Sequence, residues 1–166
     1  MADTDGGGGA VLVAATGTTG LVAGVWLAYV CSVMPALGRS DDRVFVEVMR
    51  NINDVIQNPV FLTPFFGALL LTAVAAWRSR GTRRRGWTLA ALVLYGAVFL
   101  ITSAVGVPLN DALAAAGDPV RARADFETPW VTWNLVRAVL TTAAFGCLLG
   151  AFVARGDERT EPARAP

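Results

Sequence analysis

Histidine and lysine are both missing from this 166-residue sequence, and charged residues make up only 16% of it. Without histidine, the usual haem ligand and most zinc and non-haem iron sites are excluded. The two cysteines, Cys31 and Cys147, stand singly in apolar stretches, where small packing residues are expected. No basic patch is interleaved with aromatic residues. We therefore expect no metal, no cofactor and no nucleic-acid partner.

What the sequence has in abundance is apolar residues, at 54%, arranged in long runs between clusters of charge. Soluble domains carry about 25% charged residues, so this composition is typical of a membrane protein. The predicted fold is all-α, an antiparallel bundle of four transmembrane helices at about 10–37, 59–77, 87–107 and 128–154. One membrane domain, 10–154, is expected between disordered tails at 1–9 and 155–166. The first tail lacks a positive segment, so we expect an uncleaved first helix.

Several residues mark where these helices begin and end. Pro35 is expected to end or kink the first helix near its exit. Asn58 followed by Pro59 predicts the start of the second span, with Asn58 as its N-cap. Residues 108–116 are expected to form a short helix, and Thr128 is expected to cap the fourth span.

Gly20 and Gly24 lie four residues apart on one face of the first span, a spacing that lets two helix backbones approach closely. Tight helix packing is the simpler interpretation, and room for a flat ligand is the alternative. The same face can serve contacts inside the bundle or between copies in a homo-oligomer.

The segment 39–57 is apolar on one side and polar on the other. The apolar residues that recur at helical spacing are Phe45, Val48, Met49, Ile52, Val55 and Ile56. This pattern predicts an amphipathic helix at the membrane surface, between spans 1 and 2. A lid over the mouth of the bundle fits the same periodicity.

Orientation follows from the distribution of arginine. Five arginines stand between the second and third spans, flanked by Trp77 and Trp87, and the positive-inside rule places them in the cytoplasm. Both termini then lie there too. The predicted inner segments hold eight arginines and five acids, whereas the outer segments hold five arginines and eight acids. We predict an integral protein of a bacterial-type plasma membrane with both termini cytoplasmic.

The fourth span carries the best candidate for a site. Its polar and aromatic residues fall at i, i+3, i+4 and i+7, on one face of a helix, and are Trp130, Trp133, Asn134 and Arg137. A guanidinium in an apolar span costs at least about 2.5–3.5 kcal/mol, so it usually faces the protein interior and has a partner. We expect an enclosed polar pocket that opens to the far side. For each tryptophan alone, an interfacial anchor is the alternative.

Four stretches, taken in order, resemble a known family. They are GLVAGVWLAYVCSVMPAL at 20–37, MRNINDVIQNPVF at 49–61, VPLND at 107–111 and WVTWNLVRAV at 130–139. Together they are similar to the small four-helix membrane proteins labelled anthrone-oxygenase-like, formerly a domain of unknown function. No single stretch is specific, whereas their combined order is, and it covers nearly the whole chain between the tails.

The resemblance implies a four-helix membrane bundle. Some members of the family act in polyketide pathways, where they oxidise an anthrone to the anthraquinone with molecular oxygen and without metal or flavin. Many relatives have no demonstrated activity. The motif positions carried over are Asn51, Asn53, Asn58, Pro108, Asn110, Trp130, Trp133, Asn134 and Arg137.

Anthrone oxidation needs a flat apolar slot, a group that stabilises the enolate oxygen, and a base. The residues expected to bind substrate are Trp26, Trp130 and Trp133, by stacking, with Asn51 and Asn53. The residues expected to be catalytic are Arg137, Asn134, Asn110 and Asp111. Among them, Arg137 would stabilise the anion, and it stays protonated and so is no base.

The base is expected among the far-side carboxylates, which are Asp111, Asp118, Asp125 and Glu127. Asp111 comes first because it adjoins Asn110. A carboxylate must be desolvated to raise its pKa for this work. The alternatives are that all four are solvated loop charges, or that Asp111 neutralises Arg137.

The predicted function is thus cofactor-independent oxidation of a lipophilic polycyclic phenol or anthrone, with the bilayer, an aromatic small molecule and oxygen as partners. The alternative is a non-catalytic membrane protein that binds a lipid, a quinone or a partner subunit, with Arg137 as a structural counter-ion. A small transporter is a third class. It is disfavoured by the single intramembrane charge and by the lack of a broken inverted repeat.

Overall fold

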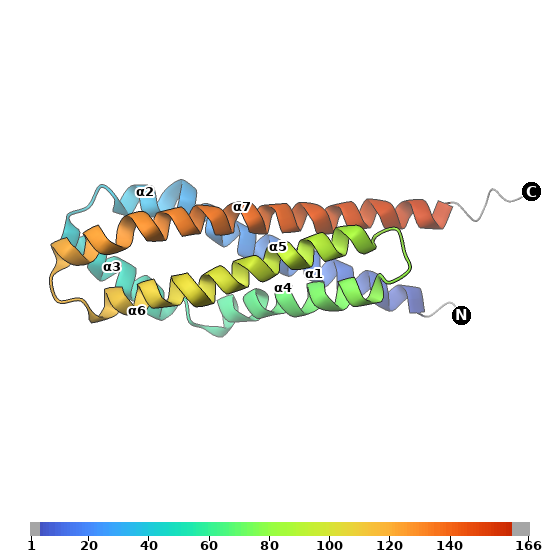
Figure 1. The fold of residues 1–166 in the computed structure, drawn as a ribbon, viewed down its shortest axis with the longest axis horizontal. Helices are drawn as coiled ribbons and strands as arrows, with labels where there is room; N and C mark the ends of the chain where they lie inside the picture. The colour runs from blue at the N-terminus through green and yellow to red at the C-terminus, as the bar shows by residue number, and fades with distance from the viewer. Residues whose placement is uncertain (1–3, 161–166) are drawn as a thin grey trace, which may run out of the picture.

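Four long helical rods lie antiparallel in a bundle (Figure 1). The computed structural model describes residues 4–160, and the side chains of residues 7–154. The first rod consists of α1 (Thr4–Ala28), the π-helical turn η1 (Tyr29–Val33) and α2 (Met34–Leu37). The second is α4 (Pro59–Arg78). The third consists of α5 (Arg85–Ile101), the π-helical turn η2 (Thr102–Gly106) and α6 (Val107–Ala115), and the fourth is α7 (Pro119–Thr160). Helix α3 (Asp42–Val55) joins the first two rods.

These elements confirm the predicted fold class. All four rods contain a helix that is long and apolar enough to cross a membrane, at 7–37, 59–78, 85–115 and 119–154. Asn58 caps α4 as predicted, because its Oδ1 accepts hydrogen bonds from the backbone N–H groups of Val60 (2.9 Å) and Phe61 (3.2 Å). Helix α1 begins at Thr4 and α7 continues to Thr160. The remainder of the predicted tails lies outside the described residues.

The fourth helix begins well before residue 128. The Asp118 carboxylate accepts a hydrogen bond from the Val120 N–H at 3.1 Å, so Asp118 caps α7 with Pro119 in its first turn. Thr128 lies inside the helix, and the prediction that it caps the span was wrong. Asp118–Pro119 and Thr128–Pro129 offer the same signal, a capping side chain before a proline, and the chain uses the earlier one.

The first and third rods continue past prolines through wider helical turns. In η1 the Met34 N–H donates to the Tyr29 carbonyl, and in η2 the Val107 N–H donates to the Thr102 carbonyl, each five residues back. Pro35 and Pro108 each come two residues after the end of the π-helical turn. In a regular α-helix a proline ring clashes with the carbonyl four residues earlier, and the wider turn relieves this crowding. The first rod stays helical through Pro35 and ends two residues later, at Leu37, and the predicted short helix at 108–116 continues the third rod as α6.

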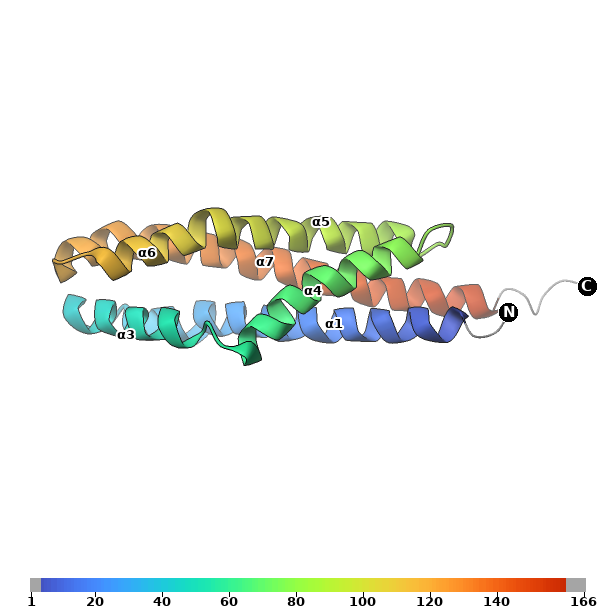
Figure 2. The same ribbon diagram turned by 90° about the horizontal axis from the view of Figure 1, so that it is seen from below.

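Helix α4 is much shorter than the other rods. It crosses obliquely between α1 and α5 (Figure 2), and α7 packs on the other sides of those two helices to close the ring. Its 20 residues span about 30 Å, the thickness of the bilayer's hydrocarbon core. Because α4 ends beside the start of α1, where Arg78 contacts Gly7, the other rods extend beyond α4 at the end remote from the termini.

Helix α3 occupies this remote end, beyond the start of α4, and packs on α6 and α7 (Figures 1 and 2). Its apolar side chains Phe45, Val46 and Met49 are at most 2% exposed. The amphipathic helix between spans 1 and 2 is thus present. Part of its apolar side is buried against α6 and α7, whereas Val55 is 69% exposed. Both predicted placements, at the membrane surface and as a lid over the mouth of the bundle, stay predictions.

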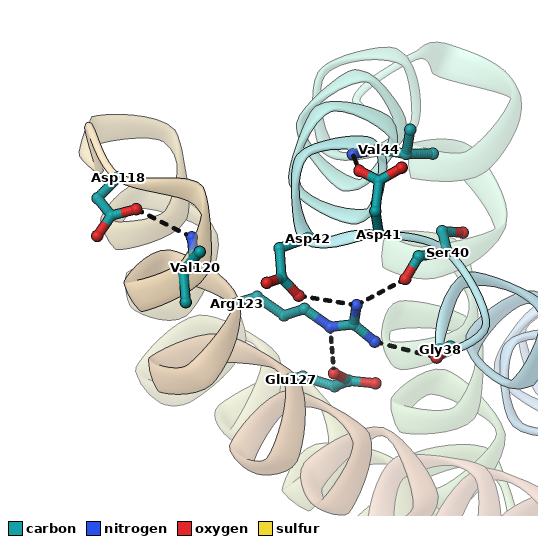
Figure 3. A network of polar contacts seen from close by, with 9 residues as sticks. All are labelled: Gly38, Ser40, Asp41, Asp42, Val44, Asp118, Val120, Arg123 and Glu127. Atoms are coloured by element: carbon teal, nitrogen blue, oxygen red, sulfur yellow. Dashed lines mark hydrogen bonds and ion pairs between the residues drawn. The ribbon is translucent and has the colours of Figure 1, made fainter.

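Arg123 of α7 holds the start of α3 in place (Figure 3). Its guanidinium donates hydrogen bonds at 2.7–3.1 Å to the carbonyl oxygens of Gly38 and Ser40 and to the carboxylates of Asp42 and Glu127. It also lies 4.6 Å from the centre of the Phe45 ring. A single side chain thereby joins α7 to the segment between α2 and α3.

A second arginine, Arg50 of α3, holds the other half of that helix. Its Nε and Nη2 atoms donate to the Leu113 carbonyl at 3.0 and 2.9 Å, and Nη2 also donates to the Ala116 carbonyl. These carbonyls lie at the C-terminal end of α6, where the Leu113 carbonyl also accepts a hydrogen bond from the N–H of the capping residue Ala116. Helix α3 is therefore fixed to both elements that it covers.

The two glycines of the first span face opposite environments. A Cβ at Gly20 would lie 3.0 Å from the Phe145 ring of α7, whereas a Cβ at Gly24 would meet nothing within 4 Å. Gly20 therefore serves close packing inside the bundle. Gly24 faces outwards.

We expect Gly20→Val to destabilise the protein by about 1–3 kcal/mol, because the added methyl groups press on the Phe145 ring. Gly24→Val, the matched control, should change stability by less than about 0.5 kcal/mol. Thermal unfolding of both variants in one detergent is the measurement. Equal losses would contradict the assignment of Gly20 to the packed face.

The predicted orientation has a direct test. Trp77 and Trp87, which are 60% and 48% exposed, flank the arginine-rich connection between α4 and α5. A green fluorescent protein fused after residue 166 should fluoresce in a bacterial host, and a periplasmic phosphatase at the same place should stay inactive. An active phosphatase fusion would reverse the assignment.

Candidate functional site

A cavity of about 270 Å³ lies between the end of α3 and the first turns of α4, inside the bundle. This volume is near the lower end for ligand pockets, which is about 300 Å³. Its aromatic walls come from four rods and are formed by Trp26, Tyr29, Phe61, Phe65, Phe66, Phe99 and Trp130. Its polar side chains include Asn53, Gln57, Asn110, Asp111 and Arg137. Both π-helical turns contribute, η1 through Tyr29 and η2 through Gly106.

Arg137 is buried at the wall of this cavity, only 4% exposed. Its guanidinium carbon lies 4.2 Å from the centre of the Trp26 ring and 5.4 Å from that of Trp130. Cation–π contacts of this kind contribute about 0.5–2 kcal/mol each, more when water is excluded. Among the described side chains, no carboxylate lies within 4 Å of it. Its charge is thus stabilised by indole rings and is not neutralised.

Three side chains that line the cavity have a buried nitrogen without a hydrogen-bond partner among the described residues. These atoms are Trp26 Nε1, Asn53 Nδ2 and Arg137 Nε. Buried polar groups are normally paired, and leaving one unpaired costs about 1–3 kcal/mol. All three are donors, so the unpaired buried polar atoms of the lining are N–H groups. Such a site favours a ligand that presents oxygen atoms or negative charge.

Two further residues shape the wall beside Arg137. The Trp130 indole N–H donates to the Asn110 side-chain oxygen at 3.1 Å, and this bond fixes the indole. The Asn110 amide nitrogen takes no part in the bond. Tyr29 packs against Trp130 with ring centres 5.4 Å apart, and it is close enough to Arg137 for the two groups to interact electrostatically.

Gly106 allows the Arg137 guanidinium to approach the η2 turn. A Cβ at this position would lie 3.2 Å from the Nη1 atom of Arg137, closer than an ordinary contact. The π-helical turn and its glycine therefore leave space that the guanidinium occupies. Any larger side chain at residue 106 would have to displace the guanidinium.

The structure brings Trp26, Asn53, Asn110, Asp111, Trp130 and Arg137 together around the cavity, and three other predicted residues lie elsewhere. Asn134 is 1% exposed, and its Nδ2 donates to the Trp26 carbonyl at 3.4 Å, so it ties α7 to α1. Trp133 is 38% exposed and points away from the lining. Asn51 is exposed on α3 beside a shallow groove.

The four carboxylates predicted as candidate bases lie in different places. Asp118 caps α7, Asp125 forms a surface ion pair with Arg121 (3.9 Å), and Glu127 is bound by Arg123. Asp111 is exposed and lies at the rim of the cavity, without a salt bridge to Arg137. Within residues 4–160, no group of three His, Cys, Asp or Glu side chains is placed to hold a metal ion.

Sequence reasoning missed several lining residues. Tyr29 stands in a π-helical turn that no periodicity signals. The phenylalanines Phe61, Phe65 and Phe99 look the same in sequence whether they face lipid or a cavity, because both surroundings are apolar. The proline two residues after each π-helical turn is the one usable signal.

The fold and this site define a class, a four-helix membrane protein with an aromatic, cationic cavity inside the bundle. A family model described as Anthrone oxygenase matches residues 51–147, more than half of the chain. The chain therefore belongs to the anthrone oxygenase family. No curated protein and no solved structure matches it.

We expect Trp130→Phe to lower the stability by about 0.5–1.5 kcal/mol, because the variant keeps an aromatic ring but loses the hydrogen bond to Asn110. Trp133→Phe is the matched control and should be nearly neutral, since its indole is partly exposed and lines no cavity. Denaturant or thermal unfolding in detergent measures both. A larger loss in Trp133→Phe would contradict the described geometry.

Proposed function

We propose that this protein oxidises a lipophilic polycyclic phenol of the anthrone type with molecular oxygen, and that Arg137 stabilises the enolate. The observation that carries the proposal is the buried, un-neutralised guanidinium at the wall of an aromatic cavity. A cation with no carboxylate partner is expensive in an apolar setting, and an anionic ligand would remove that expense. Family membership supports an oxygenase and is consistent with this chemistry.

The lining of the cavity would offer an anthrone both aromatic rings and N–H donors. Flat rings would pack against the aromatic side chains that line the cavity from α1, α4, α5 and α7. The N–H donors of Arg137, Trp26 and Asn53 would then meet the oxygen atoms of the ligand. In a low-dielectric site such fixed donors stabilise a developing oxyanion far better than water does.

The proposed reaction converts the anthrone CH₂ group and one O₂ molecule into the quinone carbonyl and one water molecule. Loss of a proton from the CH₂ carbon gives the enolate, whose charge rests mainly on oxygen near Arg137. The enolate passes one electron to O₂, and the resulting radical and superoxide combine to form a carbon–oxygen bond. After protonation, the hydroperoxide loses the remaining C–H proton as its O–O bond breaks, which releases water and leaves the C=O group.

Asp111 is the proposed base. Of the four far-side carboxylates considered, it is the one that lines the cavity, next to Asn110. A ring system bound below it would cover the carboxylate and exclude water, which raises the proton affinity that a base requires. The Asn110 amide is proposed to help position the substrate, and Asn134 is proposed to act through Trp26, whose backbone it holds.

The alternative function is non-catalytic binding of a quinone, whose carbonyl oxygens would accept from the same three donors. Turnover separates the two. A binder would retain its ligand unchanged in air, whereas an oxygenase would convert an anthrone to the anthraquinone.

The test uses purified protein in nanodiscs with a hydroxylated anthrone in air, followed by quinone absorbance above the spontaneous rate. Replacing Arg137 by Ala should slow the catalysed reaction by about 10²–10³-fold, as removal of one oxyanion donor does elsewhere. The rate of Arg137→Lys should lie between those of the wild type and Arg137→Ala, because lysine keeps the charge but loses the planar guanidinium.

The matched control is Arg121→Ala, which removes an exposed arginine from the same helix. Its rate should equal that of the wild type. Circular dichroism and size-exclusion chromatography must show that the Arg137 variants are folded like the wild type. Retained activity in folded Arg137→Ala would refute the anion-stabilising role, and no acceleration by the wild type would refute the anthrone chemistry.

A further inference from the structure

The exposed residues that line the cavity form one continuous border. Ser103, Val107 and Asp111 follow one another by one turn on the third rod, and Val107 is 48% exposed. Phe66 of α4, 47% exposed, and Gln57 of the α3–α4 connection face the two ends of this strip. The opening therefore has two parts, the first bordered by the aromatic ring of Phe66 and the second by the polar side chains of Gln57 and Asp111.

The first part of the opening lies at a depth where lipid tails surround the protein. Phe66 comes seven residues after the start of α4, about 10 Å along a helix that is itself about as long as the hydrocarbon core is thick. Its ring meets that of Phe99 edge to face, with centres 5.8 Å apart. Ser103 follows Phe99 by one turn on the same helix face.

A fixed hydrogen bond closes the wall on the side of this opening that lies deeper in the membrane. The Tyr95 hydroxyl donates to the Phe65 carbonyl at 2.9 Å, and Tyr95 is fully buried. This contact holds α4 and α5 together. Beyond it the lining passes to the η2 turn, where Thr102 and Ser103 border the cavity.

The end that faces water is covered by a helix that is held in place. Arg123 and Arg50 fix α3 to α7 and α6 through the hydrogen bonds described above. Swinging α3 aside would break both sets and expose its buried Phe45 and Met49. The remaining gap on this side is bordered by Gln57 and Asp111, which an apolar ring system would have to pass.

We propose that the ligand enters this cavity laterally from the bilayer, between Phe66 on α4 and Ser103 on η2. This inference rests on the proposed function for the ligand's chemistry, a lipophilic polycyclic phenol. Such a molecule accumulates among lipid tails because transfer of its apolar surface from water is favourable. Entering through the opening, its apolar rings stay in contact with aromatic side chains while its oxygens reach Arg137.

The test narrows each part of the opening by one tryptophan. A stable hydroxyanthraquinone serves as the probe, because it is not turned over, and its binding quenches the fluorescence of the tryptophans beside the cavity. Stopped-flow mixing with proteoliposomes gives the association rate. We expect Ser103→Trp to slow association on the order of tenfold and Gln57→Trp to slow it by less than about twofold.

Leu100→Trp is the matched control for Ser103→Trp. It places the same bulk on the same helix, at a residue that is 67% exposed and does not line the cavity. A second pair guards against misfolding of the tryptophan variant. Phe66→Ala should widen the opening and speed association, whereas Leu70→Ala, one turn further along α4 and 66% exposed, should not.

The outcomes are distinguishable from those of the activity assay. Equal or greater slowing in Gln57→Trp would show entry from water and overturn the lateral route, whatever the catalytic result. Slowing in Ser103→Trp beside normal rates in Leu100→Trp would support the route even if no anthrone is oxidised. Failure of the wild type to bind any hydroxyanthraquinone would overturn both the lateral route and the proposed class of ligand.

Discussion

The contact of Arg137 with Trp26 and Trp130 is the interaction on which the candidate site depends. A guanidinium within a membrane span is costly, and here the two indole faces take the place that a carboxylate would normally hold. Each tryptophan is in turn held by a neighbour: Asn134 donates to the Trp26 backbone carbonyl, and the Trp130 indole N–H donates to Asn110. One charge thereby links α1, α6 and α7. The arrangement leaves the charge available to a ligand, which a salt bridge would not.

The shortness of α4 decides where this site can be. Four helices close a ring only over the length that α4 covers, and beyond it α3 takes the fourth place, packed on α6 and α7. The cavity lies at the change from one helix to the other, because neither α4 nor α3 fills the corner between them. It extends from the α3–α4 connection to Phe66, about 10 Å along α4.

Much of this could be predicted from sequence because the bilayer restricts the chain so strongly. Apolar runs gave the four spans, Asn58–Pro59 gave the start of α4, and the spacing of Trp130, Asn134 and Arg137 gave one buried face. Trp133 belongs to the same pattern, yet at 100° per residue it stands about 40° beyond Arg137, where the face meets its surroundings. Interior and lipid-facing apolar residues look alike in sequence, so the phenylalanine wall was not predictable. The early start of α7 was missed because two Asx/Thr–proline pairs carried the same signal.

The two π-helical turns have a consequence for how such a site can arise in a helical bundle. A π-helical turn holds about one residue more than an α-helical turn, so every residue beyond it is rotated by about 100° around the helix axis. An insertion of a single residue is therefore enough to redirect the whole face of a rod that follows, with its backbone hydrogen bonds largely kept. In this protein both such turns border the same cavity, through Tyr29 on one rod and Gly106 on another. Two changes of one residue each can thus remodel the interior of a bundle whose number of helices, loops and membrane crossings stays the same.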